Sequence, residues 1–124
     1  MISFIDHYFC VSDLRGSITG LVNFGEWREF NLVKSNAGVS RGNHYHKQTE
    51  EGFIILEGRI QVVCQEVLSG IKQTHEVTSG NVFIISKMVC HQFIVIEPSV
   101  WINFLSEPMD SQNPDFYRLD INTD

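Results

Sequence analysis

Short runs of β-branched and aromatic residues, separated by turn-forming residues, constrain the fold of this chain more than any other feature. Such runs predict strands, and the Gly, Pro, Asn and Ser residues between them predict turns. We expect seven strands, at residues 18–24, 28–34, 52–56, 59–67, 82–85, 91–96 and 100–105. The turns recur at short intervals and no window keeps a helical period. The pattern therefore predicts an all-β sandwich or small barrel.

Two details of these strands extend the prediction. Glu57-Gly58 lies between two apolar runs and indicates a tight hairpin turn, with Gly58 at positive φ. Residues 82–85 and 91–96 are apolar on both faces, so they need cover from a second sheet, from a second copy of the chain, or from both. We therefore expect a homodimer.

Length and composition limit the classes of function. The 124 residues predict one domain, with a polar tail at about 106–124 that wraps the surface. The formal charge of −6 disfavours a nucleic acid as partner. No apolar run is long enough to span a membrane, and the first residues lack a signal-peptide pattern. The three cysteines have no paired spacing, which favours free thiols in the cytoplasm.

Three histidines and a glutamate form the main candidate site. His44 and His46 are two residues apart, so on a strand both imidazoles point to one face. Glu51 and His91 each lie at the start of a later expected strand. Three ring nitrogens and one carboxylate converging in a barrel make a mixed site that suits Zn, Fe, Mn, Ni or Cu.

Other notable residues have more ordinary interpretations. A lone histidine is usually a surface or core residue, and we interpret His7 and His75 in that way. Cys90 should face away from His91 and is interpreted as a buried small residue. Trp101 and Phe93 are interpreted as core residues, with stacking on a sugar or base as the alternative.

The spacing of the candidate residues resembles that of the cupin family, whose fold is a double-stranded β-helix or jelly-roll barrel. The series Gly38-x5-His44-x-His46-x4-Glu51-x6-Gly58 resembles the first cupin motif. The eleven-residue step from Gly80 to His91 resembles the second. The family's usual Pro, Gly and Asn in that motif are here Ser86, Met88 and Val95, which leaves the turn geometry open but not the role of His91.

A narrower resemblance, over residues 13–117, is to the cupins that modify nucleotide sugars. It is carried by residues 13–16 (Asp-Leu-Arg-Gly), 41–46 (Arg-Gly-Asn-His-Tyr-His) and 113–115 (Asn-Pro-Asp). The group includes dTDP-4-dehydrorhamnose 3,5-epimerases and sugar 3,4-ketoisomerases. The resemblance is closest to the C-terminal cupin domain of capsular-polysaccharide UDP-sugar epimerase/reductases.

This resemblance implies proton transfer next to a ketone. A neutral imidazole removes the proton, and the resulting enolate is stabilised before it is reprotonated. The family's base maps to His44, and a tyrosine, which the sequence does not place at Tyr45 or Tyr117, often returns the proton. Three carboxylates are candidates for orienting the base: Asp110, Asp115 and Glu51.

The resemblance also implies substrate and metal contacts. Arg41 and Arg15 resemble the family's diphosphate contacts, a role that suits the planar guanidinium. The simple epimerases typically have Gln where this chain has His46. All four ligand positions are filled here, so we expect a divalent metal held by His44, His46, Glu51 and His91, and no nucleotide cofactor.

Three functions follow from these observations. The first is an isomerase that epimerises or keto-isomerises a nucleotide-linked 4-keto-6-deoxy sugar in surface-polysaccharide biosynthesis. The second is a metal-dependent oxygenase, because three histidines and one glutamate also suit iron. The third is a cupin that binds a sugar without catalysis. The string at residues 41–46 favours the isomerase.

Overall fold

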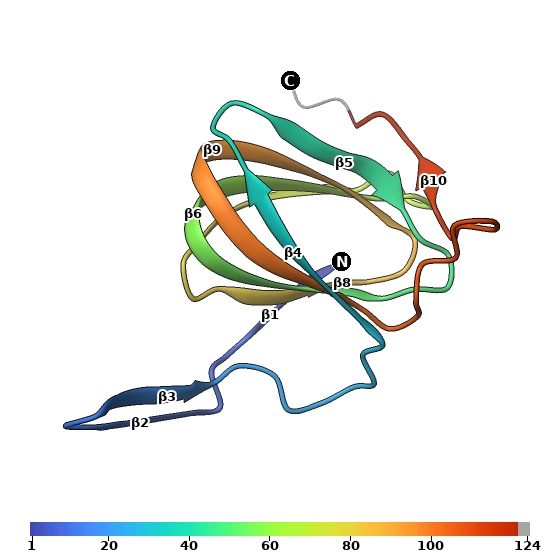
Figure 1. The fold of residues 1–124 in the computed structure, drawn as a ribbon. Coiled ribbons are helices and arrows are strands. Elements are labelled where there is room, and N and C mark those ends of the chain that lie inside the picture. Colours follow the sequence, from blue (N-terminus) through green and yellow to red (C-terminus); the bar gives the residue numbers. More distant parts are fainter. Residues whose placement is uncertain (122–124) are drawn as a thin grey trace.

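The fold is a barrel of antiparallel strands from which one two-stranded hairpin projects (Figure 1). It is a computed structural model that describes residues 1–121. The strands are β1 (Ile2–Ile5), β2 (Phe9–Asp13), β3 (Gly16–Gly20), β4 (Glu29–Ser35), β5 (Ser40–Tyr45), β6 (Glu51–Glu66), β7 (Lys72–Thr78), β8 (Val82–Ile85), β9 (Val89–Leu105) and β10 (Tyr117–Arg118). No part of residues 1–121 is helical, and accordingly these residues contain no apolar helix that could cross a membrane. The predicted all-β, jelly-roll architecture is confirmed.

Two long strands, β6 and β9, form the centre of the barrel. They pair with each other along nearly their whole lengths, from Glu51 opposite Leu105 to Glu66 opposite Val89. The sheet order is β1-β8-β6-β9-β5-β10, with β4 paired to β9 and β7 paired to β6. Each long strand therefore belongs to both halves of the barrel. The hairpin β2–β3 forms a separate sheet (Figure 1).

The predicted hairpin turn at Glu57-Gly58 is wrong. Residues 52–56 and 59–67 lie in one continuous strand, β6, and the turn expected at residues 97–99 lies inside β9. Gly58 does have positive φ, at 97°, but it forms part of a bulged region where the register with β9 shifts. A Cβ atom at Gly58 would lie 2.1 Å from the Ser99 Oγ atom. The glycine thus permits two bent strands to pack closely, which in the sequence looks like a turn.

Several strands are missing from the prediction, among them β1, β2 and β7. β7 carries mostly polar residues, and only Val77 in it is buried. All five residues of β2 are exposed, and the run expected at residues 18–24 is β3, which ends at Gly20. Burial on one face produces the alternation by which a strand is recognised, so exposed strands escape such a prediction.

The core lies between the two halves of the barrel and consists of aliphatic and aromatic side chains. Its buried members are Phe53, Ile55, Ile60, Val62, Cys64, Val77, Phe83, Ile85, Val89, Phe93, Val95 and Trp101. A smaller cluster includes Val63, Cys90 and Ile121, with Ile94 packed against it. The doubly apolar strand β8 is buried entirely within its own chain. The tail does more than wrap the surface, because Ile121 is buried and β10 pairs with β5; the last three residues of the predicted tail lie outside the described residues.

The three cysteines differ sharply in accessibility, which leads to a first prediction. Cys10 is exposed, whereas Cys64 and Cys90 are buried, and all three are free. Burial raises the pKa of Cys64 to about 12 and that of Cys90 to about 11. Because the thiolate is the reactive species, we expect Ellman's reagent at pH 8 to modify Cys10 alone in the native protein. All three thiols should react in denaturant, and Cys10→Ser should abolish the native reaction; rapid native modification of that variant would contradict the burial.

Candidate metal and active site

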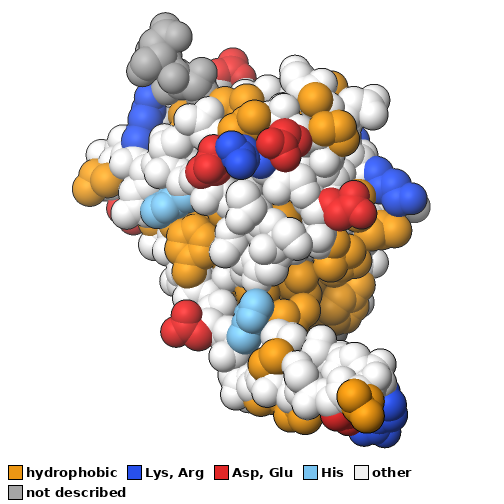
Figure 2. Space-filling model, turned by 90° about the vertical axis from the view of Figure 1, so that its left-hand side faces the viewer, with side chains coloured by type: hydrophobic (Ala, Val, Ile, Leu, Met, Phe, Trp, Pro, Cys, Tyr) orange, Lys and Arg blue, Asp and Glu red, His pale blue; other side chains and the backbone are white. Residues whose placement is uncertain are grey.

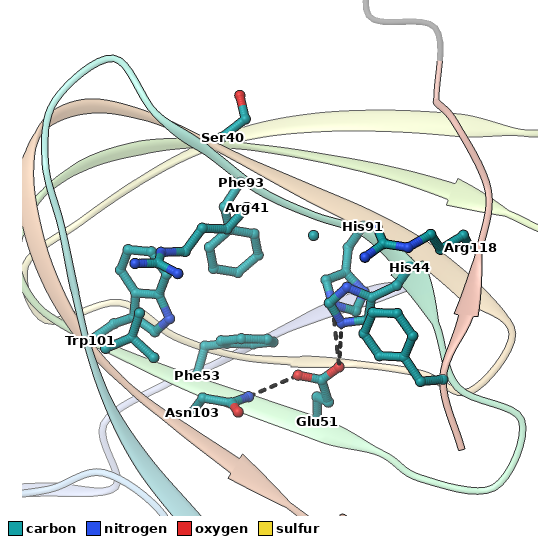
Figure 3. A pocket seen from close by; sticks show the side chains of 13 residues that line it. Ser40, Arg41, His44, Glu51, Phe53, His91, Phe93, Trp101, Asn103 and Arg118 are labelled. Carbon is teal, nitrogen blue, oxygen red and sulfur yellow. Dashed lines mark hydrogen bonds and ion pairs between the residues drawn. The ribbon is translucent and has the colours of Figure 1, made fainter. Parts of the chain in front are cut away.

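The four predicted ligands converge inside the barrel. One donor atom from each of His44, His46, Glu51 and His91 lies within 4.8 Å of the others. The His91 Nε2 atom is 3.2 Å from Glu51 Oε1, the His44 Nε2 atom is 3.7 Å from the same oxygen, and His46 Nε2 contacts it directly. The donors come from β5, the segment after it, β6 and β9. The structure thus assembles the whole predicted set around one carboxylate oxygen, and Figure 3 shows His44, Glu51 and His91 of this set.

A bulge in β5 turns His44 toward the cavity. Gly42 has φ 106°, and a Cβ atom there would lie 2.5 Å from the His91 carbonyl oxygen, so only glycine fits. Asn43 has φ 60°, a conformation that asparagine tolerates better than most residues. The register between β5 and β9 shifts across these residues. Tyr45 then faces away from the cavity, where its ring stacks on Tyr117 at 5.5 Å.

The turn before His91 keeps its geometry despite the unusual residue in it. Met88, which stands where cupins usually have glycine, has φ 60°. Its amide donates to the His46 carbonyl at 2.8 Å, and its carbonyl accepts from the Val67 amide at 3.0 Å. These two hydrogen bonds hold a conformation that a side chain disfavours. The departure at Met88 therefore leaves His91 in place.

A second set of contacts orients the ligands. The His46 Nδ1 atom donates to the Asp115 carbonyl oxygen, which leaves Nε2 directed at Glu51. The Asn103 side-chain amide donates to Glu51 Oε2 at 2.8 Å. The Asp115 carboxylate in turn accepts from the Lys47 and Gln48 amides, each at 2.8 Å. Such outer contacts fix the orientation of metal-binding side chains.

The three histidines keep Glu51 ionised although it is buried. Burial acts against the charged carboxylate, but the charge of His91 and hydrogen bonds from all three rings outweigh it. Together they hold the pKa of Glu51 well below the ordinary 4.5. For His46, burial is likewise outweighed by Glu51, and the pKa is raised. In the protein without metal, the site is therefore a network of a carboxylate and imidazole donors.

The depressed pKa of Glu51 leads to a prediction on acid stability. An unfolded chain takes up the carboxyl proton near pH 4.5, while the folded protein takes it up only at lower pH. The stabilisation that ionised Glu51 contributes is thus fully present above about pH 4.5 and is lost as the pH falls through the pKa of the folded state. At pH values below 4.5, we expect the urea concentration at the unfolding midpoint of the metal-free protein to decrease as the pH is lowered. This decrease should be less steep in Glu51→Gln. If the midpoints of the two proteins decreased equally with falling pH, the lowered pKa of Glu51 would be contradicted.

His44 differs from the other three members of the site. Its side chain is 20% exposed, against 4–6% for the other three. Burial, which outweighs the nearby Glu51, lowers its pKa, so the ring is neutral near pH 7. The Phe116 ring stacks on it with centroids 4.4 Å apart and planes inclined by 22°. A neutral, partly exposed imidazole held against a flat wall can accept a proton from a bound molecule.

The site opens into a cavity of about 410 Å³ inside the barrel. Its walls are both aromatic and charged, and Figure 3 shows most of them: Val33, Ser40, Arg41, Gly42, His44, Glu51, Phe53, His91, Phe93, Trp101, Asn103, Phe116 and Arg118. Arg41 is fixed by its Nε atom, which donates to Ser35 Oγ at 2.7 Å, and by a second donation to the Lys34 carbonyl at 3.2 Å. Trp101 and Phe93 belong to the core, as expected, and also line the cavity.

Several predicted contacts lie elsewhere. Arg15 is at the tip of the β2–β3 hairpin, where it pairs with Asp13 at 2.5 Å and is 90% exposed, so it does not line the cavity of its own chain. Neither Tyr45 nor Tyr117 lines it. Of the three candidate acids, Glu51 is the one near His44, because Asp115 contacts His46 and Asp110 accepts from amides of its own loop.

Sequence reasoning missed three residues of the site. Asn103 was included in a predicted apolar strand that is part of β9. A polar residue within such a run was the available signal of a role in the site. Phe116 and Arg118 lie in the tail, on alternate positions around Tyr117. That alternation over three residues is too short to distinguish a cavity wall from a surface segment.

The donor set fits a divalent transition metal. Imidazole nitrogens and one carboxylate suit Zn and its neighbours, and a ring nitrogen that donates to a carbonyl, as in His46, is the usual support for such a ligand. Three of the four donors are buried, and all four lie close together. The residues that would hold the ion are therefore His46, Glu51 and His91, with His44 within reach.

Comparison with known proteins identifies a family for this chain. The family model described as "Polysaccharide biosynthesis C-terminal domain" matches residues 11–117. A UDP-2-acetamido-2,6-beta-L-arabino-hexul-4-ose reductase from Pseudomonas aeruginosa is 24% identical over 120 residues, which cover 89% of this chain and 31% of the reductase. The chain thus spans about a third of the length of this curated relative.

Solved structures share the fold. The capsular polysaccharide assembling protein CapF from Staphylococcus aureus matches with a TM-score of 0.73 and 23% identity, over 91% of this chain and 34% of CapF. A dTDP-4-dehydrorhamnose 3,5-epimerase from Sulfolobus tokodaii matches with a TM-score of 0.77 and 20% identity, over 95% and 81% of the two chains. A 3,4-ketoisomerase from Helicobacter canadensis matches with a TM-score of 0.78 and 16% identity, over 94% and 90%.

Proposed function

This chain belongs to the polysaccharide biosynthesis C-terminal domain family, and from that membership and the site we propose that it is a sugar-nucleotide isomerase. Its substrate is a nucleotide-linked 4-keto-6-deoxy sugar, and its product is the C3 or C5 epimer or the keto-isomer. The observation that carries the proposal is the neutral, partly exposed ring of His44 at the edge of a charged cavity. The free thiols also suit the cytoplasmic location that we propose.

His44 acts as the base in this mechanism. The carbons that flank a ketone carry acidified protons, and the His44 imidazole removes one of them. The electrons of the broken C–H bond form a C=C bond, and the carbonyl π electrons move to oxygen to give an enolate. Return of a proton to the same carbon from the other face inverts it, whereas proton shifts between neighbouring carbon and oxygen atoms move the ketone.

The other three members of the site would hold the metal. The sequence assigns His44 to both roles, but one ring nitrogen cannot bind a metal and accept a proton at the same time. The greater exposure of His44 and its longer distance to Glu51 support its separation from His46, Glu51 and His91. Three protein ligands with an open position are typical of catalytic zinc sites. A bound metal would supply Lewis-acid polarisation of the substrate carbonyl.

Arg41 and the aromatic wall support a nucleotide sugar as the ligand. Arg41 lines the cavity, and its two hydrogen bonds go to neutral acceptors, so its charge is available to a diphosphate. Trp101 provides an aromatic surface on the same side of the cavity (Figure 3). The name of the Pseudomonas aeruginosa relative includes a UDP-linked hexul-4-ose, which favours UDP sugars within this class.

Deuterium wash-in tests the proposal. The protein is incubated in D2O with dTDP- and UDP-linked 4-keto-6-deoxy sugars, and NMR follows deuterium at C3 and C5. We expect exchange at one of these carbons with at least one sugar. If no sugar exchanges, the isomerase assignment is wrong. Oxygen consumption would then favour the oxygenase, and saturable binding alone would favour a binding module.

We further propose that two copies of the chain form a dimer. An isolated two-stranded hairpin is marginally stable in water, yet β2–β3 exposes Val11 at 57% and Ile18 at 66%. β4 exposes Phe30 at 64% and Leu32 at 59%. Figure 2 shows hydrophobic side chains gathered on one face of the barrel and on the projecting hairpin. A substrate contact by Arg15, at the tip of this hairpin, requires such a second copy.

The proposed dimer predicts the molar mass of the protein in solution. We expect light scattering to give twice the mass of one chain, and Ile18→Asp to give one chain mass, because a charge on an apolar contact opposes association. Leu68→Asp, at an 85% exposed site on the β6–β7 turn, is the matched control and should remain dimeric. A monomeric wild type at micromolar concentration would contradict the proposal.

A further inference from the structure

The positive charge of the cavity exceeds what Arg41 alone provides. Among the lining residues, Arg41 and Arg118 are the cations and Glu51 is the one carboxylate. The Glu51 carboxylate is directed at the three histidines around it and contacts neither arginine. Neither arginine forms an ion pair within residues 1–121. The cavity of an acidic protein thus holds two guanidinium groups without a carboxylate partner.

Arg118 is located at the histidine end of the cavity. Its backbone pairs with that of His44, and its guanidinium lies 5.3 Å from the Phe116 ring, which itself stacks on His44. Figure 3 shows Arg118 extending toward His44 and His91, whereas Arg41 lies beside Trp101 at the opposite end. The two arginines therefore cannot serve the same group of a bound molecule.

The segment that carries Arg118 is firmly attached. Asp115 accepts three hydrogen bonds, from the Lys47 amide, the Gln48 amide and Thr49 Oγ1. After Arg118, the Leu119 amide donates to the Asn43 carbonyl at 3.2 Å. The stacking of Tyr117 on Tyr45 fixes the strand between these points. The backbone of Arg118 is therefore held before any ligand binds, so its guanidinium reaches the cavity from a fixed point of attachment.

The other side-chain donors of the cavity are occupied or distant. The amide of Asn103 donates to Glu51. Arg41 and Ser40 lie away from His44 in Figure 3. No lysine or tyrosine is among the lining residues. Arg118 is thus the one cationic donor at the end of the cavity where His44 would remove a proton.

We propose that Arg118 is a catalytic residue that stabilises the enolate oxygen formed when His44 removes a proton next to the ketone. This inference rests on the isomerase function proposed above. The guanidinium donates one or two N–H groups to the ketone oxygen, and these bonds strengthen as the electrons of the C–H bond move onto that oxygen. Arg41 holds the diphosphate at the other end. Arg118 therefore acts in the chemical step, and Arg41 acts in substrate binding.

The test compares Arg118→Met with Arg41→Met by two readouts. Loss of one preorganised donor costs about 10²- to 10³-fold in rate. We expect Arg118→Met to lower the deuterium exchange rate at saturating sugar by about that factor. Its dissociation constant for UDP, measured by calorimetry, should stay within about threefold of wild type. Arg41→Met should instead weaken UDP binding. Guanidinium ion added to Arg118→Ala should restore part of the exchange rate.

Each outcome decides the proposal. Wild-type exchange that persists unchanged in Arg118→Met overturns the role of Arg118 and leaves the isomerase standing. A loss in Arg118→Met that appears in UDP affinity alone identifies a phosphate contact and also overturns it. An absence of exchange in wild type removes the isomerase function and this role with it. Because Arg118 is exposed, the variant should fold, and a circular dichroism melt verifies that it does.

Discussion

His44→Asn is expected to reduce deuterium exchange on the keto sugar by about 10²- to 10⁴-fold, the contribution of a positioned general base. Asparagine keeps a polar side chain at the edge of the cavity but cannot accept the proton. Since His44 is the least buried of the four site residues, the fold and the remaining ligands should persist. UDP affinity should therefore change little, which separates a loss of chemistry from a loss of binding. NMR exchange rates and calorimetric titration with UDP give the two quantities.

His75→Asn is the matched control for this change. His75 lies on β7, where its ring contacts Phe4 at 5.2 Å, and it does not line the cavity. The control should exchange at the wild-type rate. Equal losses in the two variants would indicate a general effect of removing an imidazole, and normal exchange in His44→Asn would remove His44 from the mechanism.

The second large effect concerns the metal. Glu51→Gln is expected to lower the affinity for Zn²⁺ by more than about 100-fold, because it removes the central charged ligand while its orienting partners remain. Asn103 would then face an amide in place of a carboxylate oxygen. Equilibrium dialysis against Zn²⁺, with metal analysis of the retained protein, measures the affinity. Wild type should retain one ion per chain.

Glu50→Gln provides the control for charge alone. Glu50 precedes Glu51, is exposed, and its backbone bonds to Ser106, away from the histidines. Its substitution removes one negative charge from the same segment and should leave the Zn²⁺ affinity near that of wild type. Equal affinities in Glu51→Gln and Glu50→Gln would show that the metal, if it binds, is held elsewhere.

The site was more predictable than the strands around it. His44, His46, Glu51 and His91 could be grouped from the sequence because their spacing resembles the cupin motifs, and the structure brings their donor atoms together. Gly42 belongs to the same string because its lack of a Cβ atom lets β5 approach the His91 carbonyl. Where the structure requires a particular residue type at a fixed position, the requirement is visible as a spacing in the sequence.

The strand boundaries depended on information that local sequence does not carry. Gly58 and Pro98 suggest turns, yet they face each other in one bent ladder, a relation between residues forty positions apart. Arg118 was missed for a similar reason, since its approach to His44 depends on how the tail folds back on β5. Tertiary pairing overrides local turn signals wherever two strands bend together.

The sharing of β6 and β9 between both halves of the barrel has a consequence for cooperativity. Neither half can open without breaking the ladder that runs from Glu51 to Glu66, so the barrel should lose its structure in a single step. Amide protons in the middle of these two strands would then exchange only through global unfolding, as slowly as the stability of the whole barrel dictates. The hairpin β2–β3, which contributes no strand to that ladder, would open independently and exchange first.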